Sequence, residues 1–155
     1  AGQYNVARML DRGDGEAAWL SIGEFVSAVS SLVFLLNRPS TVGYLPYYKW
    51  RFAALRRLSS RPGSRLPHLV TPLTDLVRLA SAACAGGVGF GEGGAGSVPA
   101  RARVEALIEG VCVAIVDELG VQGLSDSREP FLEWQRPRVE RGIVDPSLRS
   151  IGGAP

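Results

Sequence analysis

The stretch AAWLSIGEFVSAVSSLVFLL, residues 17–36, decides the fold. Its apolar residues recur at intervals of three and four, the period of one helix face, and Asp14 stands where an N-cap belongs. The pattern predicts a helix over residues 16–36 that ends at an Asn-Arg-Pro. The residues expected to face a core are Trp19, Ile22, Phe25, Val26, Val29, Leu32, Val33 and Leu36.

The same twenty residues are long enough to cross a membrane, but Glu24 lies among them. A central acid costs about 2.5–3.5 kcal/mol on insertion scales. The chain has 155 residues, of which 46% are hydrophobic and 21% charged, as in globular proteins that bury a core. We therefore expect a buried bundle helix and no membrane contact.

Four more helices are predicted along the chain. Pro46 can open one that reaches Leu58, with Tyr48, Phe52 and Leu55 turned inward. The third is expected to start at Thr71-Pro72 and end at Gly86, the fourth to run over residues 99–119, and the fifth to start at Ser127 and kink or restart at Pro137. The inward residues expected on the third and fourth are Leu73, Leu76, Leu79, Ala80, Ala83, Val104, Leu107, Ile108, Val111, Cys112, Ile115 and Leu119.

Residues 86–99 contain seven glycines and predict a flexible loop between helices three and four. They match G-x-G-x-x-G twice, but that fingerprint needs a strand before it, and here a helix precedes it. Because no segment alternates with the period of a strand, the fold class is all-α. We expect a bundle of about five helices in a single domain over residues 1–155.

The chain has a net charge of only +2, but its charged residues are unevenly distributed along the sequence. From Arg38 to Arg78 there are eight basic residues and one acid, Asp75, a balance of +7. Such a band favours an anionic partner, although it could equally be a solvated arginine surface balanced by acids from other segments.

Cysteine usage and composition suggest a location for the protein. Cys84 and Cys112 fall on apolar helix faces without a CxxC, which predicts free thiols in the reducing cytoplasm. Among seventeen basic residues sixteen are arginine, a bias typical of GC-rich bacterial genomes. The chain opens without a signal peptide and without Met, which is consistent with a segment of a longer protein.

Catalytic motifs are scarce. Arg61 and the only histidine, His68, have a spacing similar to that of HEPN-type helical ribonucleases, but Pro62, Gly63 and Pro67 would break a shared helix. Gly63-Ser64 lacks the paired carboxylates with which nucleotidyltransferases hold Mg²⁺. We therefore predict no catalytic residue and no metal site in this chain.

Three segments resemble a bacterial family. They are QYNVARMLDRGD at the start, LLNR at the end of the first long helix, and PYYKW with the helix after it; the segment GLSDSREPFLEWQRPRVERGIVDPSLR is similar to the family's closing part. The family is a helical domain of unknown function that follows a nucleotidyltransferase-fold domain. It is similar to the helical halves of kanamycin nucleotidyltransferase-like and minimal nucleotidyltransferases, which help to bind the acceptor.

The resemblance implies a substrate-side domain whose partner is an N-terminal nucleotidyltransferase domain. Mg²⁺ and a nucleoside triphosphate would belong to that domain, and the acceptor would be a nucleotide or a small molecule, with RNA undecided. Tyr47 and Tyr48 could stack on a base beside Lys49, or Tyr48 could pack in the bundle, where Trp50 is expected. The substrate-binding residues that we predict are Arg8, Arg12, Asn37, Tyr47, Tyr48 and Lys49. All of them except Tyr48 are expected to line one concave, positively charged surface that faces the nucleotidyltransferase domain.

Three functions stay open at this point. The first is an accessory substrate-binding domain that is not catalytic alone. The second is a HEPN-like RNA-binding or ribonuclease domain that uses Arg61 and His68. The third is a protein-interaction bundle without a ligand.

Overall fold

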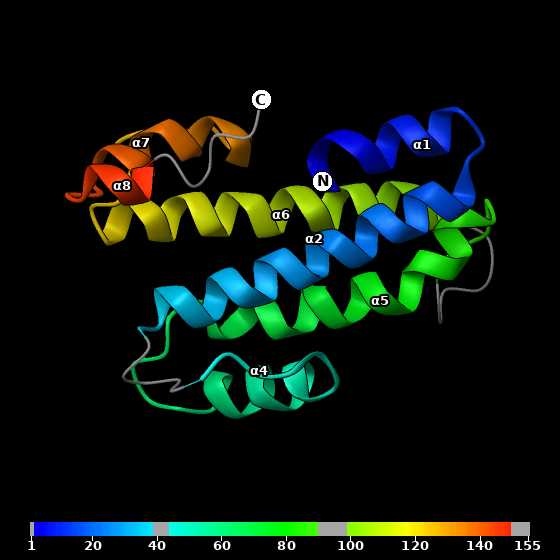
Figure 1. Cartoon of the computed structure of the whole chain (residues 1–155). Helices are drawn as coiled ribbons and strands as arrows, with labels where there is room; N and C mark the ends of the chain where they lie inside the picture. Colours follow the sequence, from blue (N-terminus) through cyan, green and yellow to red (C-terminus); the bar gives the residue numbers. More distant parts are fainter. Residues whose placement is uncertain (1, 39–43, 90–98, 150–155) are drawn as a thin grey trace. The chain divides into compact units, whose positions relative to one another are not determined.

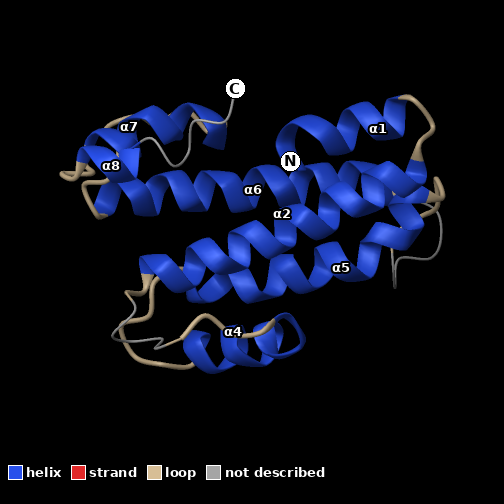
Figure 2. Cartoon of the chain, viewed as in Figure 1, coloured by secondary structure: helices blue, strands red, loops and turns tan. Residues whose placement is uncertain are grey.

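The computed structural model describes residues 2–38, 44–89 and 99–149, which are mostly helical (Figures 1 and 2). These residues form no strand, and one isolated bridge joins Val88 to Pro99. The all-α prediction is confirmed, while the predicted flexible loop lies largely outside the described residues. The α-helices are α1 (Ala7–Asp11), α2 (Gly15–Leu36), α4 (Arg51–Ser59), α5 (Val70–Cys84), α6 (Ala100–Val121), α7 (Arg136–Arg141) and α8 (Pro146–Arg149).

The chain groups into two compact units, residues 1–111 and 112–155, and α6 runs from the first into the second. In the first unit, α2 packs along α5, and α4 packs against both. The N-terminal turn Gly2–Val6 and α1 pack on α2 instead. Figure 1 shows α1 and α4 on opposite sides of the α2–α5 pair. The single domain expected from the sequence stays a prediction.

Helix α2 forms where the sequence predicts it. The Asp14 side chain accepts a hydrogen bond from the Ala17 amide at 2.9 Å and caps the first turn, as expected. Trp19 was expected in the core, and this is wrong, because it exposes 52% of its surface while Ala18 beside it is buried. The buried apolar residues of α2 are Ala18, Ile22, Phe25, Val26, Val29, Val33, Phe34 and Leu36.

Among the described helices, only α2 is long and apolar enough to span a membrane, judged by length and composition. Of its qualifying window, 44% is buried within the protein. Helix α2 packs mainly against α5 and the N-terminal turn, and this is the packing expected of a bundle helix.

The inward faces predicted for α5 and α6 are nearly all correct. Every residue named for α5 is buried, and of those named for α6 only Leu107 is merely half-buried. The start of α5 differs: the 3₁₀ turn Pro67–Leu69 leads directly into Val70, so Thr71 and Pro72 lie inside the first turn. Leu66, buried in a left-handed conformation, makes the bend before that turn.

The second and fifth predicted helices begin later than expected. Residues 48–50 form a 3₁₀ turn before α4, and because such a turn has three residues per turn, Tyr48 does not continue the inward face of Leu55 and Leu58. After Ser127 the chain stays irregular until the 3₁₀ turn Leu132–Gln135. The predicted restart at Pro137 is confirmed, since this proline lies in the first turn of α7.

The N-terminal turn and α1 were not predicted from the sequence. Asp11 accepts a hydrogen bond from the Arg101 guanidinium at 2.7 Å, and Glu105 accepts another from it at 2.9 Å. These hydrogen bonds raise the pKa of Arg101 above its usual value. A further contact joins the Gln3 amide to the Glu109 carboxylate at 3.2 Å. Packing on α2, where Val6 is buried, and these polar contacts with α6 together hold a segment that is too short to be stable by itself.

Helices α2 and α5 meet closely at Gly15, where a Cβ would lie 2.6 Å from the Cys84 carbonyl oxygen. Gly15→Ala should therefore lower the free energy of unfolding by about 1–2 kcal/mol, because overpacking forces backbone shifts. Urea unfolding followed by circular dichroism measures this change.

Gly23→Ala on the same helix is the matched control. No atom lies within 4 Å of a Cβ at Gly23, so this variant should gain about 0.5–1 kcal/mol from helix propensity. Equal effects of the two substitutions would contradict the close approach at Gly15.

Both cysteines are free thiols. Cys112 is buried, while Cys84, at the end of α5, is half-buried. Burial and, to a lesser extent, the nearby Glu16 carboxylate raise the pKa of the Cys84 thiol. A raised pKa leaves a smaller fraction of the Cys84 thiol as the nucleophilic thiolate.

Candidate functional site

The most unusual surface in the first unit is the aromatic segment, residues 44–50. Tyr47, Tyr48 and Trp50 expose 63%, 69% and 61% of their surfaces, and Tyr44 and Leu45 are exposed as well. Large rings seldom gather on the surface of a soluble domain unless they bind something. The expectations that Tyr48 and Trp50 pack in the core are therefore wrong.

Lys49 lies among these rings. The Tyr47 and Tyr48 ring centres are 4.6 Å apart with their planes at 55°. The Lys49 ammonium lies 5.8 Å from the Tyr47 ring centre and 5.7 Å from that of Trp50, both within the range of cation–π attraction. The segment thus presents ring faces and a positive charge together, as the sequence suggested for Tyr47, Tyr48 and Lys49.

Local sequence explains why the rings stay outside. Pro46 and the 3₁₀ turn after it carry the chain towards α4, whose buried residues are only Leu55 and Leu58. Arg51, the first residue of α4, donates a hydrogen bond to the Ser27 hydroxyl of α2 at 2.5 Å. Two leucines and this polar contact hold α4 in place, and no described element covers the preceding rings.

The charge of this region is entirely positive. Between Tyr44 and Leu69 the sequence has six Lys or Arg residues and no acid. Arg57 and Arg61 line a hollow of about 100 Å³ next to Pro46, and the other lining residues are Phe34, Ala54 and Leu58. The site residues predicted from the sequence included neither arginine, although the basic band between Arg38 and Arg78 was the signal that could have found them.

Asn37 has a different role from the one predicted. Its side-chain amide donates to the Val33 carbonyl at 2.8 Å and to the Arg65 carbonyl at 3.1 Å, while its oxygen accepts from the Arg65 amide at 2.8 Å. The residue is buried. The expected projection of this amide into a cleft is therefore wrong: Asn37 ties the end of α2 to the loop before α5.

Arg8 and Arg12 do not join the aromatic segment. Arg8 belongs to α1 and Arg12 follows it, while Lys49 leads into α4, and Figure 1 shows these helices on opposite sides of the α2–α5 pair. The Arg8 guanidinium lies 4.7 Å from the Tyr4 ring centre. The two arginines therefore belong to a different part of the first unit from Lys49, and their predicted role on one concave surface stays a prediction.

The break expected between Arg61 and His68 is confirmed. Arg61 lies in a turn after α4, and exposed His68 lies in the separate 3₁₀ turn before α5. Ser64 between them donates a hydrogen bond to the Leu58 carbonyl at 2.5 Å. The common helical face that the HEPN-type arrangement needs is absent from this described segment.

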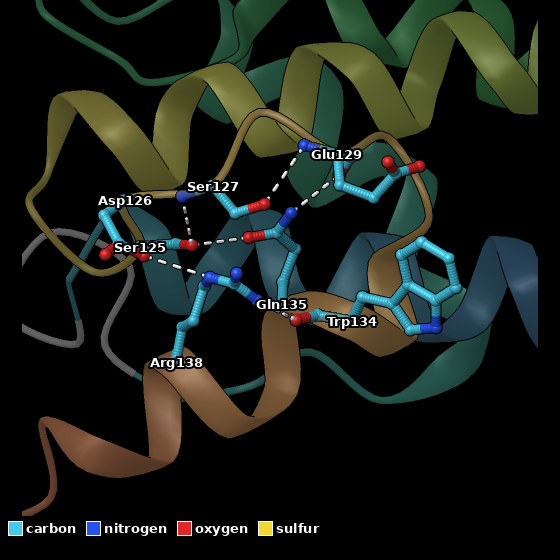
Figure 3. Close-up of polar contacts among 7 residues, drawn as sticks. All are labelled: Ser125, Asp126, Ser127, Glu129, Trp134, Gln135 and Arg138. Carbon is cyan, nitrogen blue, oxygen red and sulfur yellow. Dashed lines mark hydrogen bonds and ion pairs between the residues drawn. The ribbon is translucent and has the colours of Figure 1, made fainter.

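The second unit contains a polar network around buried Gln135 (Figure 3). Its side-chain oxygen accepts from the Ser125 hydroxyl at 2.5 Å, and its amide donates to the Glu129 carbonyl at 2.6 Å. Arg138 donates to the Asp126 carboxylate and to the Trp134 carbonyl, each at 3.0 Å. These mutual contacts brace the irregular segment before α7, where the sequence pattern had predicted a helix.

Residues of the same unit line a larger hollow of about 500 Å³, among them Ser125, Arg138 and Arg141. Its walls come mainly from the two loops that flank the network, Gly123–Asp126 and Gly142–Ile143. Arg138 already pairs with Asp126, so the hollow offers less free charge than the basic region of the first unit.

No group of three potential metal ligands occurs among the described residues. Comparison with known families matches residues 1–51 to a model described as a domain of unknown function (DUF4037). No curated protein and no solved structure matches the chain. The matched third of the chain is the part that contains LLNR and the YYKW motif.

Proposed function

We propose that this chain is the acceptor-binding helical domain of a nucleotidyltransferase-like protein and is not catalytic alone. One observation carries the proposal: exposed rings surround Lys49 inside the region that matches a domain of unknown function. Such a surface, with ring faces beside a positive charge, suits recognition of a partner molecule. The sequence resemblance supplies the nucleotidyltransferase context.

The proposal assigns the chemistry to a preceding nucleotidyltransferase-fold domain in the cytoplasm. Mg²⁺ and the nucleoside triphosphate would be held there, because the described residues offer no cluster of metal-ligating side chains. Here α4 and the aromatic segment would hold the acceptor. A protein-interaction bundle would also expose rings, and the charge of the surface is what favours an anionic acceptor over an uncharged protein face.

We expect no transfer activity from the isolated chain. Incubation with radiolabelled nucleoside triphosphates and Mg²⁺ should leave both the protein and added RNA unlabelled, since the described residues contain no group of three potential ligands to hold the metal against a triphosphate. Label on either one, retained after denaturing electrophoresis, would contradict this assignment of roles.

The gene that encodes this chain tests whether a nucleotidyltransferase-fold domain precedes it. Reading upstream of the Ala1 codon should reveal a nucleotidyltransferase-fold domain in the same reading frame. A stop codon immediately upstream, with no such domain encoded beside it, would overturn the accessory role.

A further inference from the structure

The chemistry of the aromatic segment narrows the acceptor to one class. We propose that the segment and α4 together bind single-stranded nucleic acid, with bases stacked on the rings and phosphates beside the cations. This inference rests on the proposed function, because it names the acceptor of the same site.

The exposed ring faces are the first observation that supports nucleic-acid binding. Tyr47, Tyr48 and Trp50 are all more than half exposed, and they lie within four consecutive residues. Bases stack on such faces only when they are unpaired, since a duplex already stacks its bases on each other. Tyr44, the most exposed ring of the segment, adds a further ring face three residues before Tyr47 in the sequence.

The positive charge of the aromatic segment and α4 is the second supporting observation. Lys49, Arg56 and Arg57 are exposed and form no ion pair with any carboxylate that the structure describes. The segment from Tyr44 to Leu69 contains no acid at all. A cationic acceptor such as an aminoglycoside would therefore be repelled here, while a phosphate chain would be attracted.

The open shape of the surface is the third supporting observation. The hollow beside Pro46 measures about 100 Å³. Pockets that enclose a small molecule typically measure about 300–1,000 Å³. An open surface with several rings and dispersed cations suits a polymer that lies across it better than a single enclosed molecule.

Fluorescence anisotropy of the 155-residue chain tests the proposal. The probe is a labelled oligouridylate of about 12 nucleotides, within the usual range of single-strand site sizes. We expect binding that weakens as salt rises and that is much weaker for a duplex of the same length. Trp50→Ala should weaken binding about 5- to 150-fold, the range for loss of one stacked base.

Trp134→Ala is the matched control. Trp134 is exposed to a similar degree, 58%, but it lies in the second unit beside Glu133. Its removal should leave oligouridylate binding within about twofold, a change of less than about 0.5 kcal/mol. Because both tryptophans are exposed, circular dichroism should show that both variants keep their helices.

Each other outcome overturns the proposal. Equal binding of duplex and single strand, or unchanged binding by Trp50→Ala, would mean that the surface attracts nucleic acid only through non-specific electrostatics, without base stacking. Uridine monophosphate that binds as tightly as the oligomer would make a free nucleotide the ligand. No oligonucleotide binding, with capture of an acidic protein instead, would make it a protein interface.

The two proposals can fail separately. If the longer protein transfers nucleotides to an acceptor while the oligonucleotide does not bind, only the nucleic-acid inference fails. If the oligonucleotide binds but the gene encodes no nucleotidyltransferase domain, the accessory role fails and the binding surface stands.

Discussion

Ile108→Ala should lower the free energy of unfolding by about 2–5 kcal/mol, the usual cost of truncating a buried isoleucine. Ile108 exposes only 2% of its surface, and Val104 and Val111 on the same face of α6 are buried as well. Removing three carbons there loses the transfer free energy of the side chain and leaves a cavity that the surrounding helices fill only partly. Urea unfolding monitored by circular dichroism gives the difference.

Val113→Ala on the same helix serves as the control, because nearly half of Val113 is exposed. We expect this exposed truncation to change the free energy of unfolding by at most about 0.5 kcal/mol. If the two variants unfold at the same urea concentration, the face of α6 assigned to the core is wrong.

Asn37→Ala should lower the free energy of unfolding by about 2–3 kcal/mol. This effect is large for a residue at the end of a helix, where substitutions are often mild. The side chain makes three hydrogen bonds, and two of them reach the backbone of Arg65. Alanine would remove all three hydrogen bonds, and a typical hydrogen bond contributes about 0.5–1.5 kcal/mol to stability. The loop that leads into α5 would then lose its attachment to α2.

Asn37→Asp separates the contributions of these bonds. Its carboxylate can still accept the Arg65 amide but cannot donate to the Val33 and Arg65 carbonyls. Ser60→Ala is the matched control, because Ser60 bonds only a carbonyl one turn away and is exposed. Hydrogen exchange at the Arg65 amide should speed up in Asn37→Ala and not in Ser60→Ala. Unchanged exchange in both would contradict the bracing role of Asn37.

The family resemblance of the sequence and the match to a domain of unknown function overlap in residues 1–51. Within them, the structure gives two of the predicted site residues separate tasks: Asn37 stabilises the fold, and Lys49 is presented to solvent among rings. The site predictions are therefore best tested on the aromatic segment, where substitutions should alter binding without altering the helices.

The sequence by itself determined the long helices and their buried faces. Helices α2, α5 and α6 each carry a sustained apolar period, and for α2 the cap at Asp14 marked the start. These signals are local: a helix of four or more turns with one apolar face can bury only that face. For the same reason the apolar period of α6 is enough to assign Ile108 to the core, where it lies.

Tertiary structure alone decided the candidate site. Whether Tyr48 and Trp50 are buried depends on a covering element, and none of the described helices covers them. Whether Asn37 faces solvent depends on Arg65, which is 28 residues away in sequence. Arg8 belongs to α1 and Lys49 leads into α4, and these two helices pack on different sides of α2 and α5. Contacts between distant segments leave no period in the sequence, so short segments and their polar side chains acquire their roles only when the helices pack.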